Sequence, residues 1–282
     1  MKKTVTGLSL LVVLLGFIFL TKISQFFFDA ALLLLLVLAV CEMCKLAKQK
    51  GYNVTVVPLM IITAIIYPAI YFFDLIGFFA TGAFGFILIF SFYIFDQKIK
   101  FEDFLFSLLI EVYPALLISL GFLMIHADFG EHEVGMIPLL LAASAAMCAD
   151  TFAYYFGSLI KGPKIFPSIS PKKTYSGSIA GLFGGAAGAL LVYLLFEHLK
   201  LPLNMPFTVS ETFKYPILFY SLIGVGIAVV SAIGDLGASR IKRSLEIKDY
   251  SKILGSHGGV MDRIDSILFS FVFMAITLYF IL

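Results

Sequence analysis

Long apolar runs separated by short polar segments dominate the pattern along the chain. One helix needs about 20 apolar residues to cross a bilayer core about 30 Å thick. Runs of this kind predict nine transmembrane helices, near residues 6–21, 27–47, 54–73, 75–95, 103–125, 135–160, 178–199, 215–239 and 264–282. The first run follows Lys2 and Lys3 without a clear small-residue cleavage site, which indicates a retained helix rather than a signal peptide. The sequence therefore predicts an all-α polytopic membrane protein with a single domain over residues 1–282.

The basic residues of the polar segments predict the orientation of these helices. With the N-terminus in the cytoplasm and each run crossing once, 17 of the 20 Lys and Arg residues fall on the cytoplasmic side. Cytoplasmic loops of membrane proteins carry such an excess of Lys and Arg. One missed helix would reverse the assignment of every later loop. We therefore expect a cytoplasmic N-terminus and a C-terminus on the opposite side.

Composition points to the same class of protein. Hydrophobic residues make up 61% of the chain and charged residues only 13%, whereas a soluble domain carries about 25% charged residues. A chain this apolar would expose large apolar patches to water, which excludes a soluble enzyme. The net charge of +2 gives no indication of a nucleic-acid partner. Cys41, Cys44 and Cys148 all lie in apolar runs, so we expect small buried side chains rather than a disulfide framework or a metal site.

Four carboxylates lie within or at the ends of the predicted helices. An ionisable group in the bilayer is costly and usually faces a partner or a wet cavity. Glu42 precedes Lys45 by about one helical turn, which predicts an ion pair at the membrane surface. Glu111 either lines a cavity or is protonated, and the sequence leaves this choice open. Asp150 and Asp235 each lead into a polar cytoplasmic segment and are the stronger functional candidates.

The first of these segments, residues 161–177, combines lysines, hydroxyl groups and glycine. It contains Ser170-Pro-Lys-Lys-Thr174 and Gly177 just before a predicted helix. Ammonium groups and the N–H groups of a helix N-terminus suit a phosphate. A basic loop that touches anionic lipid headgroups is an equally good interpretation. The following helix carries four glycines whose spacing predicts close helix packing: Gly181, Gly184, Gly185 and Gly188.

The second segment, residues 235–265, holds six basic and five acidic residues. If the eighth helix continues past the membrane, one of its faces carries Asp235, Ser239, Lys242 and Arg243. Asp262 and Asp265 share a face if the ninth helix begins near Asp262. Carboxylates hold Mg²⁺, which takes further ligands from phosphates, while Lys and Arg neutralise phosphate oxygens. The segment therefore predicts a site for a divalent metal together with a polyphosphate.

Longer motifs in these segments resemble those of the phosphatidate cytidylyltransferases (CDP-diacylglycerol synthases). The family's C-terminal signature is similar to Ser239-x-x-Lys-Arg243-x4-Lys248-Asp249-x7-His257-Gly-Gly-x-x-Asp262-Arg263-x-Asp265. Ser170-Pro-x-Lys-Thr174 and Asp150-Thr-x-Ala-Tyr154 also resemble patterns of that family. The chain departs from the family pattern at four positions: Ala232, Ala238, Ser176 and Lys172.

The resemblance implies transfer of a cytidylyl group from CTP to phosphatidate, which gives CDP-diacylglycerol and pyrophosphate and uses Mg²⁺. It implies Asp235 and Asp262 as Mg²⁺ ligands that meet at one metal centre, with Asp265 as a further ligand. The expected catalytic residues are Asp235, Asp262, Lys242, Arg243 and Asp265. The expected substrate-binding residues are Asp150, Lys172, Lys173, Thr174, Ser239, Lys248, Asp249, His257, Gly258, Gly259 and Arg263. A second metal ion and a homodimer are left open.

Two other functions remain as alternatives. A CTP-dependent kinase, or a cytidylyltransferase for an isoprenoid or ether lipid, would share most of these features. A transporter would hold its charged residues near the membrane midplane, whereas here they gather at one predicted side. We expect an active site that faces the cytoplasm, in a membrane of the bacterial inner-membrane type, because CTP is cytoplasmic.

Overall fold

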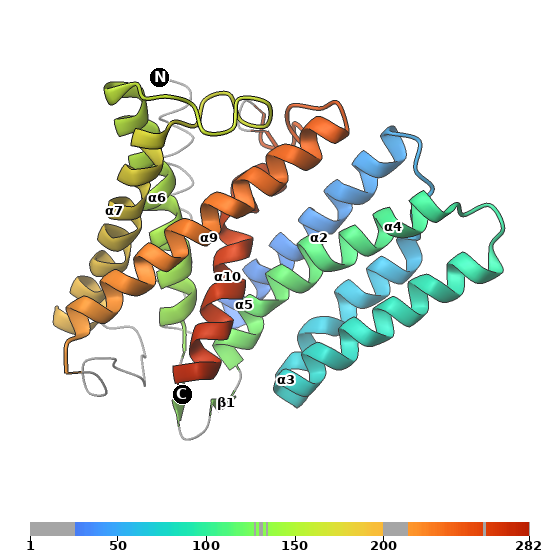
Figure 1. Cartoon of the computed structure of the whole chain (residues 1–282). Helices are drawn as coiled ribbons and strands as arrows, with labels where there is room; N and C mark the ends of the chain where they lie inside the picture. The colour runs from blue at the N-terminus through green and yellow to red at the C-terminus, as the bar shows by residue number, and fades with distance from the viewer. Residues whose placement is uncertain are drawn as a thin grey trace. The chain divides into compact units, whose positions relative to one another are not determined.

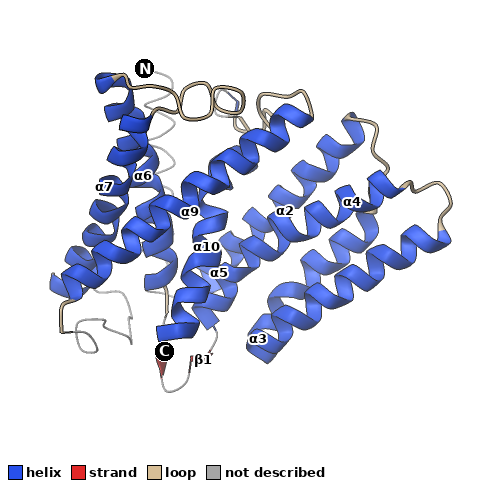
Figure 2. Ribbon diagram, in the orientation of Figure 1, coloured by secondary structure: helices blue, strands red, loops and turns tan. Residues whose placement is uncertain are grey.

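The computed structural model describes residues 26–126, 128–129, 132–133, 135–199, 214–255 and 258–281, and it is almost entirely helical (Figure 2). Its contacts divide the chain into two compact units. Unit 1 comprises Met1–Leu123 and Asp249–Arg263, and unit 2 comprises Met124–Lys248 and Ile264–Leu282. The predicted all-α architecture is confirmed.

Unit 1 contains the first helices of the described chain (Figure 1). These are α2 (Phe26–Gln49), α3 (Val56–Phe95), α4 (Phe101–Ile110), η1 (Glu111–Leu116) and α5 (Leu117–His126), which belongs to unit 1 as far as Leu123. The last three form one continuous apolar helix of 26 residues. Its central part, η1, is a π-helix that contains Pro114. Proline has no N–H to donate to the helix and clashes with the preceding turn, which accounts for a wider turn here.

The long helix α3 folds back on itself at Asp74, whose backbone angles (φ 49°, ψ −129°) are not helical. In Figure 1 the two arms, light blue and cyan, both run up and to the right from the region of the α3 label. A Cβ atom at Gly77 would clash with the carbonyl group of Ala69, and one at Gly85 would contact the side chain of Ile62. Such contacts are impossible along a straight helix. The arms therefore correspond to the two helices predicted at 54–73 and 75–95.

Unit 2 contains α6 (Ile137–Ile160), α7 (Tyr175–Val192), η2 (Tyr193–His198), α9 (Pro216–Ser244) and most of α10 (Met261–Ile281). A two-stranded hairpin, β1 (Asp128–Phe129) with β2 (His132–Glu133), precedes α6. The glycines of α7 bring three helices together. Gly184 and Gly188 lie against the backbone of α6, while Gly185 lies against Gly224 of α9. The predicted close packing is confirmed.

Seven helices of the described chain are long and apolar enough to cross a membrane. Large apolar side chains cover their outward surfaces, for example Phe72 (71% exposed), Ile76 (77%) and Phe95 (85%). Lipid chains suit such surfaces and water does not. The chain is thus an integral membrane protein. The helix predicted at 6–21 lies outside the described residues, and the count of nine and the orientation of the termini stay predictions.

Gly188→Leu should disrupt the contact between α7 and α6. The added side chain would meet the carbonyl oxygen of Ser144 and the Cα atom of Ala145. Overpacking of this kind costs about 1–3 kcal/mol. We expect a lower midpoint of thermal unfolding in detergent and loss of monodisperse protein in size-exclusion chromatography. Ala187→Leu, at the neighbouring exposed position, is the matched control and should leave both measurements unchanged. Equal midpoints for the two variants would contradict this account of the packing.

Candidate functional site

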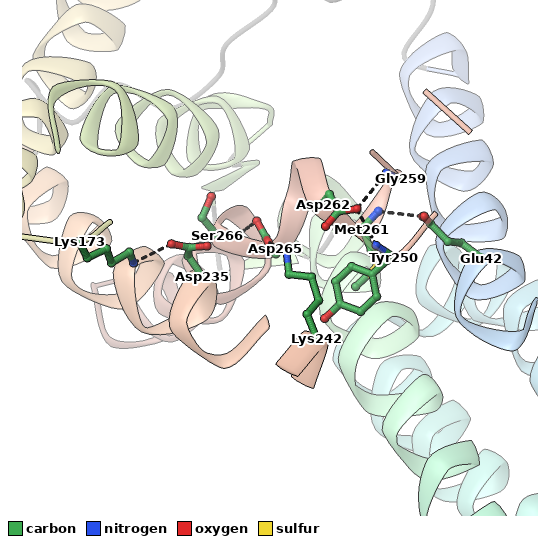
Figure 3. A network of polar contacts seen from close by, with 10 residues as sticks. All are labelled: Glu42, Lys173, Asp235, Lys242, Tyr250, Gly259, Met261, Asp262, Asp265 and Ser266. Atoms are coloured by element: carbon green, nitrogen blue, oxygen red, sulfur yellow. Dashed lines mark hydrogen bonds and ion pairs between the residues drawn. The ribbon is translucent and has the colours of Figure 1, made fainter. Parts of the chain in front are cut away.

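The first ion pair of unit 2 joins Lys173, just before α7, to Asp235 on α9. The Nζ atom of Lys173 lies 2.7 Å from Oδ2 of Asp235 (Figure 3). The same ammonium group donates a hydrogen bond to the carbonyl oxygen of Ala232 at 3.2 Å. Both side chains keep some exposure, 23% for Lys173 and 30% for Asp235. The ion pair therefore links the two segments that the sequence analysis singled out, and a ligand can still reach it.

A second ion pair in unit 2 joins Lys242 on α9 to Asp265 on α10, with 3.4 Å between Nζ and Oδ2 (Figure 3). The Ser266 N–H donates to the other oxygen of Asp265 at 2.9 Å. This pair is less accessible, since 14% of the Lys242 side chain and 10% of the Asp265 side chain are exposed. The helix α9 runs past the predicted end at residue 239, far enough to carry Lys242, and α10 begins at Met261 rather than at residue 264. Both conditions that the sequence set for the shared helix faces are therefore met.

Asp150 on α6 adds a third carboxylate to these two pairs. Its side chain is hydrogen-bonded by Ser266 and lies close enough to Asp235 and Lys173 to interact electrostatically. Asp265 interacts electrostatically with Asp235 as well. The charged cluster of unit 2 therefore consists of Asp150, Lys173, Asp235, Lys242 and Asp265. It brings together α6, α9, α10 and the segment before α7.

The segment before α7 is held in place by its own backbone and by a helix cap. Ile165 N–H donates to the carbonyl of Lys173, and Tyr175 N–H donates to that of Pro163. Thr174 is the N-cap of α7, and its hydroxyl accepts the Gly177 N–H at 3.1 Å. An N-cap threonine satisfies one of the free N–H groups of the first helical turn. Thr174 thus fixes the end of the segment next to Lys173, a structural role beside its predicted contact with substrate.

Unit 1 holds a separate arrangement around Asp262, in the first turn of α10. Its Oδ2 atom accepts the N–H groups of Tyr250 at 2.8 Å and Gly259 at 2.9 Å (Figure 3). The neighbouring Met261 N–H donates to Oε2 of Glu42 on α2 at 2.9 Å. Glu42 is 2% exposed, whereas Lys45 is exposed. The predicted ion pair between Glu42 and Lys45 is therefore wrong, because the partner of Glu42 is the distant start of α10.

The remaining predicted residues lie around these two arrangements. In unit 2, Lys172, Arg243 and Lys248 are exposed, and Ser239 is partly exposed on α9. In unit 1, Asp249 and Arg263 are exposed, whereas Gly258 and Gly259 are buried. The Gly258 N–H is directed to the carbonyl of Gly255 and that of Gly259 to Asp262. His257 lies outside the described residues.

The predicted magnesium site can be tested against the chemistry of these side chains. The charged cluster holds three carboxylates against two ammonium groups, so an added cation would improve its charge balance. Among the residues that the structure describes, no three His, Cys, Asp or Glu side chains are arranged around one metal position. Mg²⁺ is commonly bound by one or two carboxylates plus substrate phosphates, so it does not need such a preformed group. The donors of the cluster therefore fit Mg²⁺ together with a phosphate ligand.

The predicted contact of Asp235 with Asp262 at one metal joins residues of different units and stays a prediction.

Three of the positions that depart from the family pattern can be located in the structure. Ala232 contributes its backbone carbonyl to Lys173, which any residue there could supply. The hydroxyl of Ser176 lies 3.2 Å from that of Thr174, and Ala238 is fully buried.

The sequence did not identify two residues that take part in these arrangements: Ser266, which contacts Asp150 and Asp265, and Glu42, which contacts the start of α10. The available signal for Ser266 was that it directly follows Asp265 in the sequence. A buried acid on an apolar helix was the signal for Glu42, but the sequence gives no information about its partner. Glu111, which the sequence left undecided, is 2% exposed in η1 and packs against Gly85 of α3.

Comparison with known proteins gives one family match over nearly the whole chain and relatives that match about half to two thirds of it. The family described as "Cytidylyltransferase family" matches residues 1–281. A phosphatidate cytidylyltransferase of Aquifex aeolicus is 36% identical over 49% of this chain and 46% of its own length. One from Staphylococcus haemolyticus is 32% identical over 66% of this chain and 64% of its own length. A chloroplastic phosphatidate cytidylyltransferase 4 of Arabidopsis thaliana is 35% identical over 49% of this chain and 31% of its own length.

The chain thus matches about half of the length of the first of these relatives and less than two thirds of each of the others. The match to the family, by contrast, extends from the first residue through both polar segments to the end of α10. Because that match covers nearly the whole sequence, the chain belongs to the cytidylyltransferase family.

Proposed function

We propose that this protein transfers the cytidylyl group of CTP to phosphatidate and so makes CDP-diacylglycerol and pyrophosphate. The observation that carries the proposal is the charged cluster of unit 2, in which two lysines and three carboxylates gather at helices of an integral membrane protein. The names of the similar proteins, phosphatidate cytidylyltransferases, support this choice of substrates.

The chemistry needs two anions to come together. An oxygen of the phosphatidate phosphate attacks the α-phosphorus of CTP, the bond from that phosphorus to the bridging oxygen breaks, and pyrophosphate leaves with the bonding electrons. The attacking phosphate is already anionic at neutral pH, so the reaction needs no strong general base. Catalysis then depends on positioning and on neutralising charge.

Lys173 and Lys242 are the residues of the cluster suited to this task. Their ammonium groups neutralise phosphate oxygens, and their carboxylate partners Asp235 and Asp265 hold them in place in the absence of substrate. Asp150 is hydrogen-bonded by Ser266 and so helps to fix the position of α10 next to the cluster. We further propose that the exposed Arg243 and Lys248 attract the triphosphate.

We also propose that Asp235 and Asp265 hold Mg²⁺, with phosphate oxygens as the other ligands. When bound, the ion would supply additional positive charge at the reacting phosphates. The same proposal has the cluster facing the cytoplasm, from which CTP comes, in a membrane of the bacterial inner-membrane type. Phosphatidate would reach it from within the bilayer.

Product analysis tests this function. Purified protein in detergent is incubated with Mg²⁺, phosphatidate and CTP that is radiolabelled at the α-phosphorus. We expect labelled CDP-diacylglycerol and one pyrophosphate released per lipid formed. Release of CDP, with the γ-phosphate transferred to a lipid, would identify a kinase instead.

Varying the lipid in the same assay distinguishes the proposed activity from that of an enzyme that acts on another membrane lipid. An isoprenoid alcohol, its phosphate and an ether-linked analogue of phosphatidate are offered in parallel with phosphatidate itself. We expect the highest kcat/KM with phosphatidate. A clear preference for one of the other lipids would replace phosphatidate as the substrate while leaving nucleotidyl transfer in place.

A further inference from the structure

The buried carboxylate of Glu42 contacts a segment of chain far away in the sequence. Its Oε2 atom accepts the backbone N–H of Met261, 219 residues further along the chain, at 2.9 Å. A helix begins with N–H groups that have no partner within the helix, and a carboxylate near that end is favourable. A buried acid on a membrane helix is otherwise costly. Glu42 therefore has a clear physical reason to anchor the start of α10.

The second oxygen of Glu42 explains why residue 259 is a glycine. Oε1 is buried without a hydrogen-bond partner among the described residues and lies against Gly259. A Cβ atom at position 259 would overlap with this oxygen and would come within 2.8 Å of the Ser251 hydroxyl. The carboxylate of Glu42 thus occupies the space that any side chain at position 259 would need.

The same short segment is bound to Asp262. The Gly259 N–H donates to Oδ2 of Asp262 at 2.9 Å, and Gly258 adopts a positive φ of 80° directly beside that carboxylate. Glu42 contacts Gly259 and Met261, the residues that lead into Asp262. A displacement of Glu42 would therefore move the turn that orients Asp262.

We propose that Glu42 is a positioning residue, which holds the Gly258–Gly259 turn and the start of α10 so that Asp262, the Mg²⁺ ligand that the family resemblance implies, keeps its orientation. The proposal rests on the proposed function for its catalytic consequence. The contact itself concerns unit 1 alone. Glu42 acts through Asp262 and does not need to touch a substrate.

Three variants on α2 test the proposal by two independent measurements, hydrogen exchange of residues 250–262 followed by mass spectrometry and CTP-dependent turnover. Glu42→Leu removes the acceptor for Met261. We expect faster exchange in residues 250–262, with α4–η1–α5 unchanged, and turnover lower by about 10- to 100-fold, as for residues that orient a functional group. Glu42→Gln keeps an acceptor oxygen and should retain most of the protection and of the turnover. Lys45→Gln, one turn away and exposed, is the matched control and should resemble the wild type in both.

A double-mutant cycle with Gly259→Ala tests whether the Glu42 carboxylate packs directly against position 259. In the wild type this substitution should lower turnover and raise exchange, because the new methyl group displaces the Glu42 carboxylate. In the Glu42→Ala background, where that space is vacated, it should add little. Contacting residues show such non-additive effects, whereas independent sites add.

Several outcomes would overturn the proposal. One is normal exchange of residues 250–262 in Glu42→Leu, and another is faster exchange with unchanged turnover. Loss of turnover in Lys45→Gln, or full additivity of Gly259→Ala with Glu42→Ala, would do so as well. If the wild type makes no CDP-diacylglycerol, the proposed function fails, whereas the exchange data still decide whether Glu42 holds the turn.

Discussion

Asp235→Asn should abolish nearly all CTP-dependent turnover while the protein still folds. Asparagine keeps the size of the side chain and one oxygen, but it loses the charge that pairs with Lys173 at 2.7 Å and that would hold Mg²⁺. Loss of one preorganised electrostatic contact to a reacting group lowers kcat by about 10²- to 10³-fold. Turnover is measured as pyrophosphate release at saturating CTP and phosphatidate. Monodispersity and the thermal unfolding midpoint in detergent show whether the variant is folded.

The control for this variant is Glu246→Gln, which also neutralises an acid of unit 2 but at an exposed position outside the charged cluster. It should retain normal turnover. Near-normal, Mg²⁺-dependent activity of Asp235→Asn would remove Asp235 from the proposed metal site.

Exchanging the two charges separates an ion pair that only stabilises the fold from one that functions. Lys173→Asp combined with Asp235→Lys keeps opposite charges at the two positions, so an ion pair can still form between them. We expect the thermal midpoint to recover relative to the single variants, while turnover stays low because each charge now occupies the wrong position. Recovery of turnover would mean that the pair serves the fold alone.

Hydropathy predicted most of the helices because each must supply enough apolar length to cross a bilayer. It even separated the two arms of α3 at residue 74, where the chain reverses at Asp74. The hydropathy pattern predicts a start of α7 at residue 178, whereas the helix begins at Tyr175. Its polar first turn has low hydropathy. The N-cap signal of Thr174, a better indicator of the boundary, was available in the sequence.

From the sequence, the candidate site could be predicted only for residues that lie near one another on the same helix. Helical periodicity placed Asp235 and Lys242 on one face of α9, and both belong to the charged cluster. Their partners, Lys173 and Asp265, come from other elements, and no spacing rule relates these positions. Local spacing also suggested Lys45 for Glu42, because residues three or four apart are neighbours on a helix. The actual contact, with Met261, depends on tertiary packing.

Lys242→Met should destabilise the protein clearly, because it breaks an ion pair with little access to water. The Lys242 and Asp265 side chains are only 14% and 10% exposed, so removal of the lysine leaves a carboxylate with little access to water. Breaking a buried ion pair by removing one partner costs about 3–5 kcal/mol, because an uncompensated charge remains. We expect a clear fall in the midpoint of thermal unfolding in detergent, together with loss of turnover.

The double variant Lys242→Met with Asp265→Asn distinguishes these two effects. Neutralising Asp265 removes the buried charge while the Ser266 N–H can still donate to the remaining side-chain oxygen, as it does at 2.9 Å in the wild type. The unfolding midpoint should therefore recover most of the loss, a coupling expected for residues in direct contact. Turnover should not recover, since the ammonium group that neutralises phosphate is still missing. A double variant that is both stable and active would restrict Lys242 and Asp265 to a structural role and leave Lys173 as the phosphate-binding lysine of the cluster.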